Sequence, residues 1–285
     1  MAKAFSSSFV RANGIKTHFI HAGRGDPVVL VHGGGPGASG EHNWSKNIGA
    51  LAEHFQVFAI DLIGYGYTDK PPIEYSYKAK VDHLAGFIDA LCLDQVRLCG
   101  NSMGSYVAVR YMIDNPERVR KISMVATATV ATAMGVGEFS PQGGSVRRKV
   151  GEQVTEESMR AWLGMLLFNQ ANITDELVRG RVRVALLPGT AQAQASYWQH
   201  MQKLKVDPNL HQWYDLTHRL PRMTIPMSLI WGKNDRFAPI ELAERLRQAL
   251  PNLTEYHPVE DAGHQVQNDQ PEIFNRLTTA FFLRA

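Results

Sequence analysis

Length, composition and charge describe an ordinary globular protein and exclude several other classes. The chain has 285 residues, 44% of them hydrophobic and 20% charged, which suffices for one large α/β domain or a domain with an inserted subdomain. The formal net charge of +3 is too small to indicate a nucleic-acid partner. No apolar run approaches the roughly 18 residues of a membrane span.

The N-terminus and the cysteines indicate the cellular compartment of the protein. The first residues lack the apolar segment of a signal peptide. The two cysteines, Cys92 and Cys99, are too few for a disulfide framework, which favours a reducing compartment. We therefore expect a cytoplasmic protein without a membrane partner.

The first part of the chain predicts a hairpin followed by alternating strands and helices. The alternating segments 8–12 and 16–23 flank Asn13-Gly14, a dipeptide suited to a hairpin turn. The next elements are predicted, in chain order, as strands at 27–33 and 55–61, a helix at 78–92, a strand at 96–100, a helix at 103–115 and a strand at 121–127. This alternation predicts a mostly parallel sheet with helices on both faces.

The pattern changes in residues 131–219, which contain helical periodicity and no convincing strand. A loop at 135–145 is followed by helices predicted at 155–168, 174–187 and 190–205. The sheet pattern then resumes, with strands at 225–232 and 254–259 and helices at 239–249 and from Pro271 onward. We expect a core domain of residues 1–130 and 220–285, and a helical lid of residues 131–219 that covers the site.

The segment "CGNSMGSYVAVRY" places Ser102 in a tight turn between a strand and a helix. Glycines two residues before and two residues after Ser102 let the two backbones pass closely, which presents the hydroxyl at the tip of the turn. Gly-x-Ser-x-Gly also arises by chance, but the strand before and the helix after favour a nucleophile.

A serine nucleophile needs a base, and the base needs an acid. Asp235 follows the predicted strand at 225–232, and His264 lies in the loop after the strand at 254–259. The chain order Ser102, Asp235, His264 is the order of the α/β-hydrolase triad. Asp261 is the weaker candidate acid because it lies in the histidine's own loop.

The glycine-rich segment "VHGGGPGASG" can stabilise the negative charge that develops on an attacked carbonyl. We assign the oxyanion donors to the backbone N–H groups of Gly34 and Met103. A phosphate-binding loop is the rival interpretation, but the segment has neither the Gly-Lys-Ser/Thr ending nor the Gly-x-Gly-x-x-Gly pattern.

Several segments together resemble the meta-cleavage product hydrolases, which cut carbon–carbon bonds in ring-fission products of aromatic degradation. They are "HGGGPGAS", "DLIGYGYTDKP", "GNSMG", "WGKNDRFAP" and "AGH". The resemblance covers nearly the whole chain and implies an α/β-hydrolase fold, a mostly parallel central sheet flanked by helices with an inserted helical lid. It also implies a homodimer, a small-molecule substrate and no cofactor, and no His/Cys set has metal-site spacing.

The resemblance implies substrate contacts as well as a triad. The family's substrates are 2-hydroxy-6-oxohexa-2,4-dienoates, which carry a carboxylate and an enol at one end and a ketone at the other. Asn101 matches the family's asparagine at the polar end, and Arg181, seven residues before a Pro-Gly, matches its carboxylate clamp. Arg183 is the fallback clamp, and an ordinary solvated helix face would explain either arginine. Asn43 and Gly33 complete the expected binding set.

The implied mechanism begins with a proton transfer through His264 that converts the enol to a ketone and creates an electron sink. Ser102 attacks the C6 ketone, the C5–C6 bond breaks, and water releases the acid from the enzyme. The products are a 2-hydroxypenta-2,4-dienoate and a carboxylic acid.

Two departures from the family and two rival functions accompany this prediction. The segment "GEHNWSKN" is longer than in many members of the family. Gln265 occupies the position after the histidine where the family usually has tryptophan. An esterase or lactonase could use the same triad without a carboxylate clamp, and a receptor on the same fold could bind without multiple turnover. Candidate wall residues, which core packing explains equally well, are Met134, Leu163, Leu166, Leu167, Phe168 and Trp198.

Overall fold

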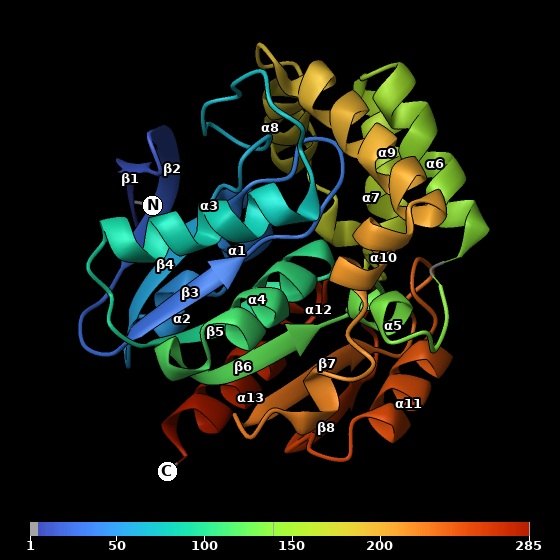
Figure 1. Cartoon of the computed structure of the whole chain (residues 1–285). Helices are drawn as coiled ribbons and strands as arrows, with labels where there is room; N and C mark the ends of the chain where they lie inside the picture. Colours follow the sequence, from blue (N-terminus) through green and yellow to red (C-terminus); the bar gives the residue numbers. More distant parts are fainter. Residues whose placement is uncertain (1–4, 139, 285) are drawn as a thin grey trace.

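An eight-stranded sheet in the strand order β1-β2-β4-β3-β5-β6-β7-β8 forms the centre of the molecule (Figure 1). The computed structural model describes residues 5–138 and 140–284, so positions 1–4, 139 and 285 of the predicted ranges lie outside the described residues. The strands are Ser6–Ala12, Ile15–Ala22, Pro27–Val31, Gln56–Ile60, Val96–Asn101, Val119–Val125, Met227–Gly232 and Glu255–Val259, numbered β1 to β8 in this order.

The predicted hairpin and the predicted parallel sheet are both confirmed. Strands β1 and β2 pair antiparallel around Asn13-Gly14, and β2 pairs antiparallel with β4. All the other neighbours, from β4 through β8, pair parallel. Because parallel strands end at the same edge, the loops after β3, β5, β7 and β8 meet there, and these loops carry the predicted site residues.

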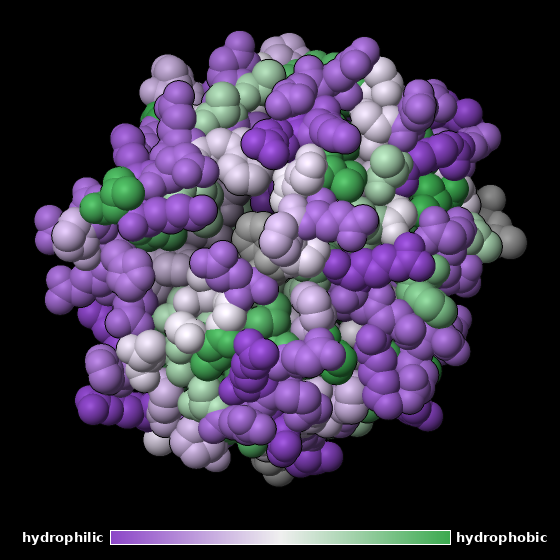
Figure 2. Space-filling model, turned by 90° about the vertical axis from the view of Figure 1, so that its right-hand side faces the viewer, coloured by the Kyte–Doolittle hydropathy of each residue, from purple (hydrophilic) through white to green (hydrophobic). Residues whose placement is uncertain are grey.

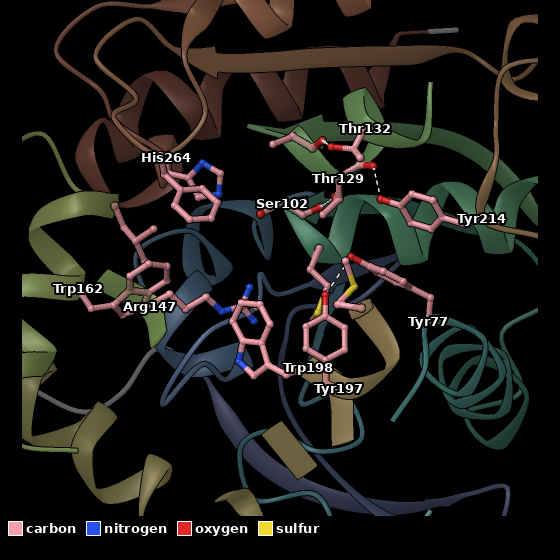
Figure 3. A pocket seen from close by; sticks show the side chains of 16 residues that line it. Tyr77, Ser102, Thr129, Thr132, Arg147, Trp162, Tyr197, Trp198, Tyr214 and His264 are labelled. Carbon is pink, nitrogen blue, oxygen red and sulfur yellow. Dashed lines mark hydrogen bonds between the residues drawn. The ribbon is translucent and has the colours of Figure 1, made fainter. Parts of the chain in front are cut away.

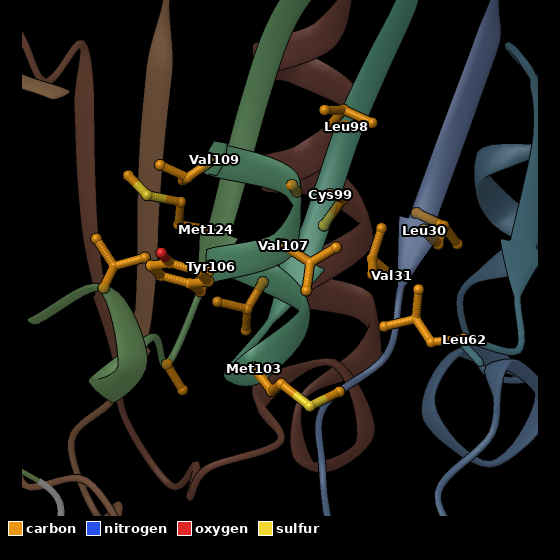
Figure 4. Packing of buried hydrophobic residues seen from close by; sticks show 14 of the residues in the cluster. Leu30, Val31, Leu62, Leu98, Cys99, Met103, Tyr106, Val107, Val109 and Met124 are labelled. Atoms are coloured by element: carbon orange, nitrogen blue, oxygen red, sulfur yellow. The ribbon is translucent and has the colours of Figure 1, made fainter. Parts of the chain in front are cut away.

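The sheet is packed by helices on both faces. Helices α3 and α4 lie across one face and α13 lies across the other (Figure 1). The helices of this core are α1 (Gly40–Trp44), α2 (Ile48–Leu51), α3 (Tyr77–Ala90), α4 (Met103–Asp114), α11 (Ile240–Ala249), α12 (Val266–Asp269) and α13 (Pro271–Leu283). Figure 4 shows α4 packed on the sheet, with fully buried Val107 and Tyr106 facing apolar strand residues. This packing holds the turn before α4 rigidly.

The segment between β6 and β7 is helical, as predicted. Its helices are α5 (Ala128–Ala133), α6 (Pro141–Glu152), α7 (Glu156–Leu166), α8 (Asp175–Ala185), α9 (Thr190–Val206) and α10 (Pro208–Tyr214), and short 3-10 helices occur at Pro116–Arg118, Gln170–Asn172 and Leu220–Arg222. Helices α6 to α9 gather beyond the carboxyl ends of the parallel strands (Figure 1). The outer face that includes α6 and α9 is mostly hydrophilic, with hydrophobic residues only in small areas (Figure 2).

The prediction of a loop at 135–145 is wrong in its second half, because α6 begins at Pro141. Ser140 caps this helix, its side chain accepting a hydrogen bond from the N–H of Gly143 at 3.1 Å, and proline occupies the first turn. The adjacent glycines 143 and 144 have low helix propensity, which is why the sequence pattern predicted a loop despite the helix-start residues Ser140 and Pro141. Gly143 is nevertheless buried, and a Cβ there would lie 2.4 Å from the ring of Phe237, so the close packing requires glycine.

Candidate active site

The turn between β5 and α4 presents Ser102 in a strained conformation. Its φ of 52° and ψ of −117° lie outside the regions that serine normally adopts. The N–H of Ser102 donates to the carbonyl of Val125 at 2.8 Å, which fixes the turn against β6. A Cβ at Gly104 would lie 2.2 Å from the carbonyl oxygen of Val31, and one at Gly100 would lie 2.5 Å from the Ser105 backbone. Both predicted glycine roles are therefore confirmed.

Asp235 and His264 come together at the same edge of the sheet. The Nδ1 of His264 and the Oδ2 of Asp235 are 2.7 Å apart, and both residues are buried. The other oxygen, Oδ1, accepts hydrogen bonds from the N–H groups of Phe237 at 2.9 Å and Ala238 at 2.7 Å. With Nδ1 donating to the carboxylate, Nε2 is left as an acceptor for a serine proton.

Ser102 and His264 line one cavity, and an imidazole nitrogen is directed toward the serine hydroxyl (Figure 3). The cavity has a volume of about 60 Å³. The residues that line it are Gly34, Tyr77, Ser102, Met103, Ala128, Thr129, Thr132, Arg147, Trp162, Leu166, Tyr197, Trp198, Met201, Tyr214, Phe237 and His264. The structure thus brings the predicted nucleophile, base and acid into one site.

The two predicted oxyanion donors also lie in this cavity wall. Gly34 and Met103 both line it together with Ser102. A Cβ on Gly34 would lie 3.3 Å from the Met103 sulfur and 3.5 Å from the Tyr65 hydroxyl, so the glycine loop packs tightly against the start of α4. Both residues therefore adjoin the nucleophile, and their role as oxyanion donors stays a prediction.

Asn101, Asn43 and Gly33 lie behind the cavity wall rather than among the residues that line it. The Nδ2 of Asn101 donates to the carbonyls of His264 at 3.1 Å and Val125 at 3.3 Å. Its Oδ1 accepts from the Asn43 Nδ2 at 3.4 Å, and a Cβ on Gly33 would lie 2.8 Å from that oxygen. Asn101 therefore ties the histidine loop to the sheet, and its predicted substrate contact stays a prediction.

Gln265 extends this amide cluster. Its Nε2 donates to the Oδ1 of Asn43 at 3.5 Å, and its Oε1 accepts from the Nδ2 of Asn268 at 2.9 Å. Gln265 is 3% exposed, so these bonds form in a desolvated setting where each partner matters. The residue after the histidine is thus part of a hydrogen-bonded network behind the catalytic loop.

The histidine loop is joined to the end of α7. Asp269 accepts hydrogen bonds from the N–H groups of Gly263 and Phe168, both at 2.8 Å, and of Asn169 at 3.1 Å. The N–H of Gln265 donates to the carbonyl of Leu166 at 3.2 Å. One carboxylate therefore connects the loop that holds His264 to the helical segment.

Arg181 is buried without a hydrogen-bond partner. It is 1% exposed, and none of its Nε, Nη1 and Nη2 atoms has an acceptor. Burial lowers its pKa to about 10. Burial also lowers the pKa of His42 to about 4, and the Arg181 charge is the next largest cause, so the guanidinium lies near that histidine. Arg181 is not among the residues that line the Ser102 cavity, whereas Arg183 is exposed.

Some cavity residues were predicted and others were missed. Leu166 and Trp198, two of the proposed wall residues, line the cavity, and Trp198 also lines an outer groove between α6 and α9. Met134, Leu163 and Leu167 are buried and Phe168 is half-buried, and none of the four lines the cavity. The missed residues are largely aromatic or cationic and come from separate elements: Tyr77, Arg147, Trp162, Tyr197, Tyr214 and Phe237. The sequence gave no signal for them, because some lie outside the predicted helices and, for the others, helical periodicity does not distinguish a cavity wall from a core.

In residues 5–138 and 140–284, no group of three or more His, Cys, Asp or Glu side chains could hold a metal ion. Within the same part of the chain, no helix combines the length and apolar character that crossing a bilayer requires.

Comparisons with known proteins agree with this geometry. Residues 26–271 match the family model for the alpha/beta hydrolase fold. A 2-hydroxy-6-oxo-2,4-heptadienoate hydrolase from Pseudomonas putida is 32% identical over 95% of this chain and 94% of its own length. A 2-hydroxy-6-oxononadienedioate/2-hydroxy-6-oxononatrienedioate hydrolase from Paraburkholderia xenovorans is 30% identical, over 99% of this chain and 96% of its own.

A solved structure adds to this similarity. The crystal structure of a single-substitution mutant of the meta-cleavage product hydrolase CumD superimposes with a TM-score of 0.82 at 28% identity, covering 98% of each chain. The chain belongs to the α/β-hydrolase family. Within that family it is one of the meta-cleavage product hydrolases.

Proposed function

We propose that the protein hydrolyses the C5–C6 bond of a 2-hydroxy-6-oxohexa-2,4-dienoate formed by meta cleavage of an aromatic ring. Water is consumed, and the products are a 2-hydroxypenta-2,4-dienoate and a carboxylic acid. The supporting relatives act, by their names, on a heptadienoate and on nonadienedioates or nonatrienedioates, which share the dienoate and differ beyond C6.

Each triad residue has a role that follows from its surroundings. His264, held by Asp235, shuttles the proton that converts the enol to a ketone, and this provides the electron sink for bond cleavage. Ser102 attacks the C6 carbonyl, and the N–H groups of Gly34 and Met103 stabilise the oxyanion. Water then releases the acyl group from Ser102.

The observation that carries the proposal is the buried, unpartnered guanidinium of Arg181. A charge removed from water without an acceptor is costly, and a substrate carboxylate would supply the missing acceptors. A simple esterase has no use for such a cation. Asn43 and Asn101 lie in the amide cluster behind the wall, and we assign them, with Gly33, to the same dienoate end.

The helical segment 131–219 completes the proposal as a lid over the cavity. Its helices supply Arg147, Trp162, Leu166, Tyr197 and Trp198 to the wall, while its outer face is mostly hydrophilic (Figure 2). A lid of this kind excludes water until the carbon–carbon bond has been activated.

We also propose that the protein is cytoplasmic and forms a homodimer. Cys92 and Cys99 are both free thiols, as expected in a reducing compartment. The dimer rests on the family resemblance, and sedimentation equilibrium measures it directly.

The decisive experiment follows the yellow dienolate of C6-methyl and C6-phenyl ring-fission products by absorbance. We expect bleaching with multiple turnovers and a kcat/KM at least 100-fold above that for p-nitrophenyl acetate, and no bleaching by Ser102→Ala. Efficient ester hydrolysis with intact dienolate would contradict the proposal and favour an esterase. A single slow turnover would favour a receptor.

A further inference from the structure

A second arginine, Arg147, lies in the catalytic cavity itself. It reaches in from α6 between Trp162 and Trp198 (Figure 3). Its Nη2 would lie 3.4 Å from a Cβ on Gly34, so the guanidinium is next to the oxyanion loop. Among the described lining residues, Arg147 is the only arginine or lysine, and none is an aspartate or glutamate.

Two of the three guanidinium nitrogens of Arg147 lack acceptors, while the Tyr197 hydroxyl interacts with the group. Both Nε and Nη2 are buried and have no hydrogen-bond partner. The guanidinium carbon lies 4.9 Å from the ring centre of Trp198 and 5.6 Å from that of Tyr197. Stacking on these rings stabilises the charge through the face of the guanidinium, but the N–H groups point outward in its plane. Contact with the aromatic rings therefore does not supply the hydrogen-bond acceptors that these N–H groups require.

Arg147 and Arg181 act at different places. Burial raises the pKa of Tyr65 to about 12, and the charge of Arg147 is the largest influence opposing that rise. Arg181 instead helps to lower the pKa values of His32 and His42, in both cases after burial. A Cβ on Gly34 would lie 3.4 Å from the Nη2 of Arg147, whereas a Cβ on Gly37 would lie 2.2 Å from the carbonyl oxygen of Arg181, so the two residues adjoin different glycines. The two cations are thus separate, one beside the cavity aromatics and one behind the glycine loop.

We propose that Arg147 binds a second carboxylate, carried by the substrate on the acyl side of the bond that is cleaved. The preferred substrates are then dioates, and the acid released from Ser102 is a dicarboxylate. A planar carboxylate matches the two in-plane donors of Arg147, and it would neutralise the charge in a cavity that is otherwise largely aromatic. This inference rests on the proposed function and adds the chemistry of the C6 substituent.

The test compares two synthetic ring-fission products that differ only beyond C6, one with a 2-carboxyethyl group and one with a propyl group. For the parent enzyme we expect the carboxyethyl substrate to have a kcat/KM at least tenfold higher. Arg147→Leu should lower kcat/KM about 100-fold for the carboxyethyl substrate and leave the propyl substrate within about threefold. Arg147→Lys should retain part of the preference. Arg148→Leu, which alters the adjacent arginine on α6 that does not line the cavity, should change neither value.

Two results would overturn the inference. One is equal or better turnover of the propyl substrate by the parent enzyme, and the other is an equal loss for both substrates in Arg147→Leu with its melting temperature unchanged. If Arg147→Leu does not fold well, or if no ring-fission product is cleaved, ligand binding is measured instead through the melting temperature. Succinate should raise the melting temperature of the parent and Arg148→Leu proteins more than butyrate does, and equal shifts contradict the inference. Cleavage itself separates the two proposals: if none of the ring-fission products is bleached, the proposed function is contradicted, whereas cleavage without a preference for the carboxyethyl substrate contradicts this inference alone.

Discussion

One carboxylate oxygen of Asp235 binds His264, and the other oxygen is held by backbone N–H groups of the loop that contains Asp235. The Oδ2 contact to Nδ1 is 2.7 Å, and the Oδ1 atom accepts two backbone N–H groups. The carboxylate therefore cannot rotate without losing three hydrogen bonds. This arrangement fixes the tautomer and the direction of the imidazole before substrate arrives.

Asp235→Asn should lower kcat by about 10⁴-fold, because an amide presents a donor to Nδ1 and favours the wrong imidazole tautomer. KM should change little, since Asp235 does not line the cavity. The matched control is Asp261→Asn, three residues before the histidine at a φ of 50° that asparagine tolerates. Steady-state kinetics on the C6-methyl substrate measure both, and comparable losses would make Asp261 the functional acid.

The strained turn at Ser102 predicts a stability difference between two inactive variants. Ser102→Gly should be about 1 kcal/mol more stable to urea than Ser102→Ala, because only glycine adopts a φ of 52° without cost. Neither variant should bleach the dienolate. Equal stabilities would show that the elbow stores no strain.

Arg181→Met should give two effects of opposite sign. Without substrate, the free energy of unfolding should rise by roughly 1–3 kcal/mol, because an unpaired buried charge is replaced by an apolar side chain. At the same time kcat/KM for the dienolate should fall about 100-fold, mainly through KM.

Arg183→Met is the control for this pair of measurements, since Arg183 is exposed on the same helix. It should leave both quantities nearly unchanged. If Arg181→Met destabilises the protein and spares KM, then Arg181 has a structural role and the clamp is elsewhere.

His83 makes stability depend on acid pH. It is 1% exposed, its Nδ1 accepts from the N–H of Ile63 at 3.1 Å, and its Nε2 lies 2.8 Å from the Thr17 hydroxyl. Burial lowers its pKa from 6.5 to about 3. The unfolded chain therefore takes up this proton near pH 6.5 while the folded protein does not, so stability falls as the pH falls from 6.5 toward 3.

The expected contribution of His83 to the slope is about 1.4 kcal/mol per pH unit. Urea unfolding between pH 7 and about 4.5 measures it, and His83→Asn should reduce the slope by that amount. His54→Asn, at an exposed histidine, is the control. An unchanged slope in His83→Asn would exclude this histidine as the source.

The sheet could be predicted from the sequence because its signals are local. Apolar runs such as 27–31 are bounded by glycine and proline, and Asn13-Gly14 marks the hairpin. The triad was predictable for a related reason, since chain order and the position of each residue after a strand imply the same sheet edge.

The cavity wall could not be predicted in the same way. Arg147 lies on α6, whose glycine pair suggested a loop, so no helical face could be assigned to it. Arg181 and Arg183 are two residues apart on one helix, which puts them about 200° apart around its axis, and only packing decides which is buried. The chemistry of a wall built from separate helices depends on tertiary contacts that periodicity does not contain.

The link between Asp269 and the end of α7 restricts how substrate can enter. Because the same carboxylate holds residues 168, 169 and 263, outward movement of α7 at that end would displace the general base from the nucleophile. Trp198, by contrast, separates the reaction chamber from the surface groove between α6 and α9. We expect the indole to act as the gate, so that reactants exchange with solvent while the proton-transfer machinery stays assembled.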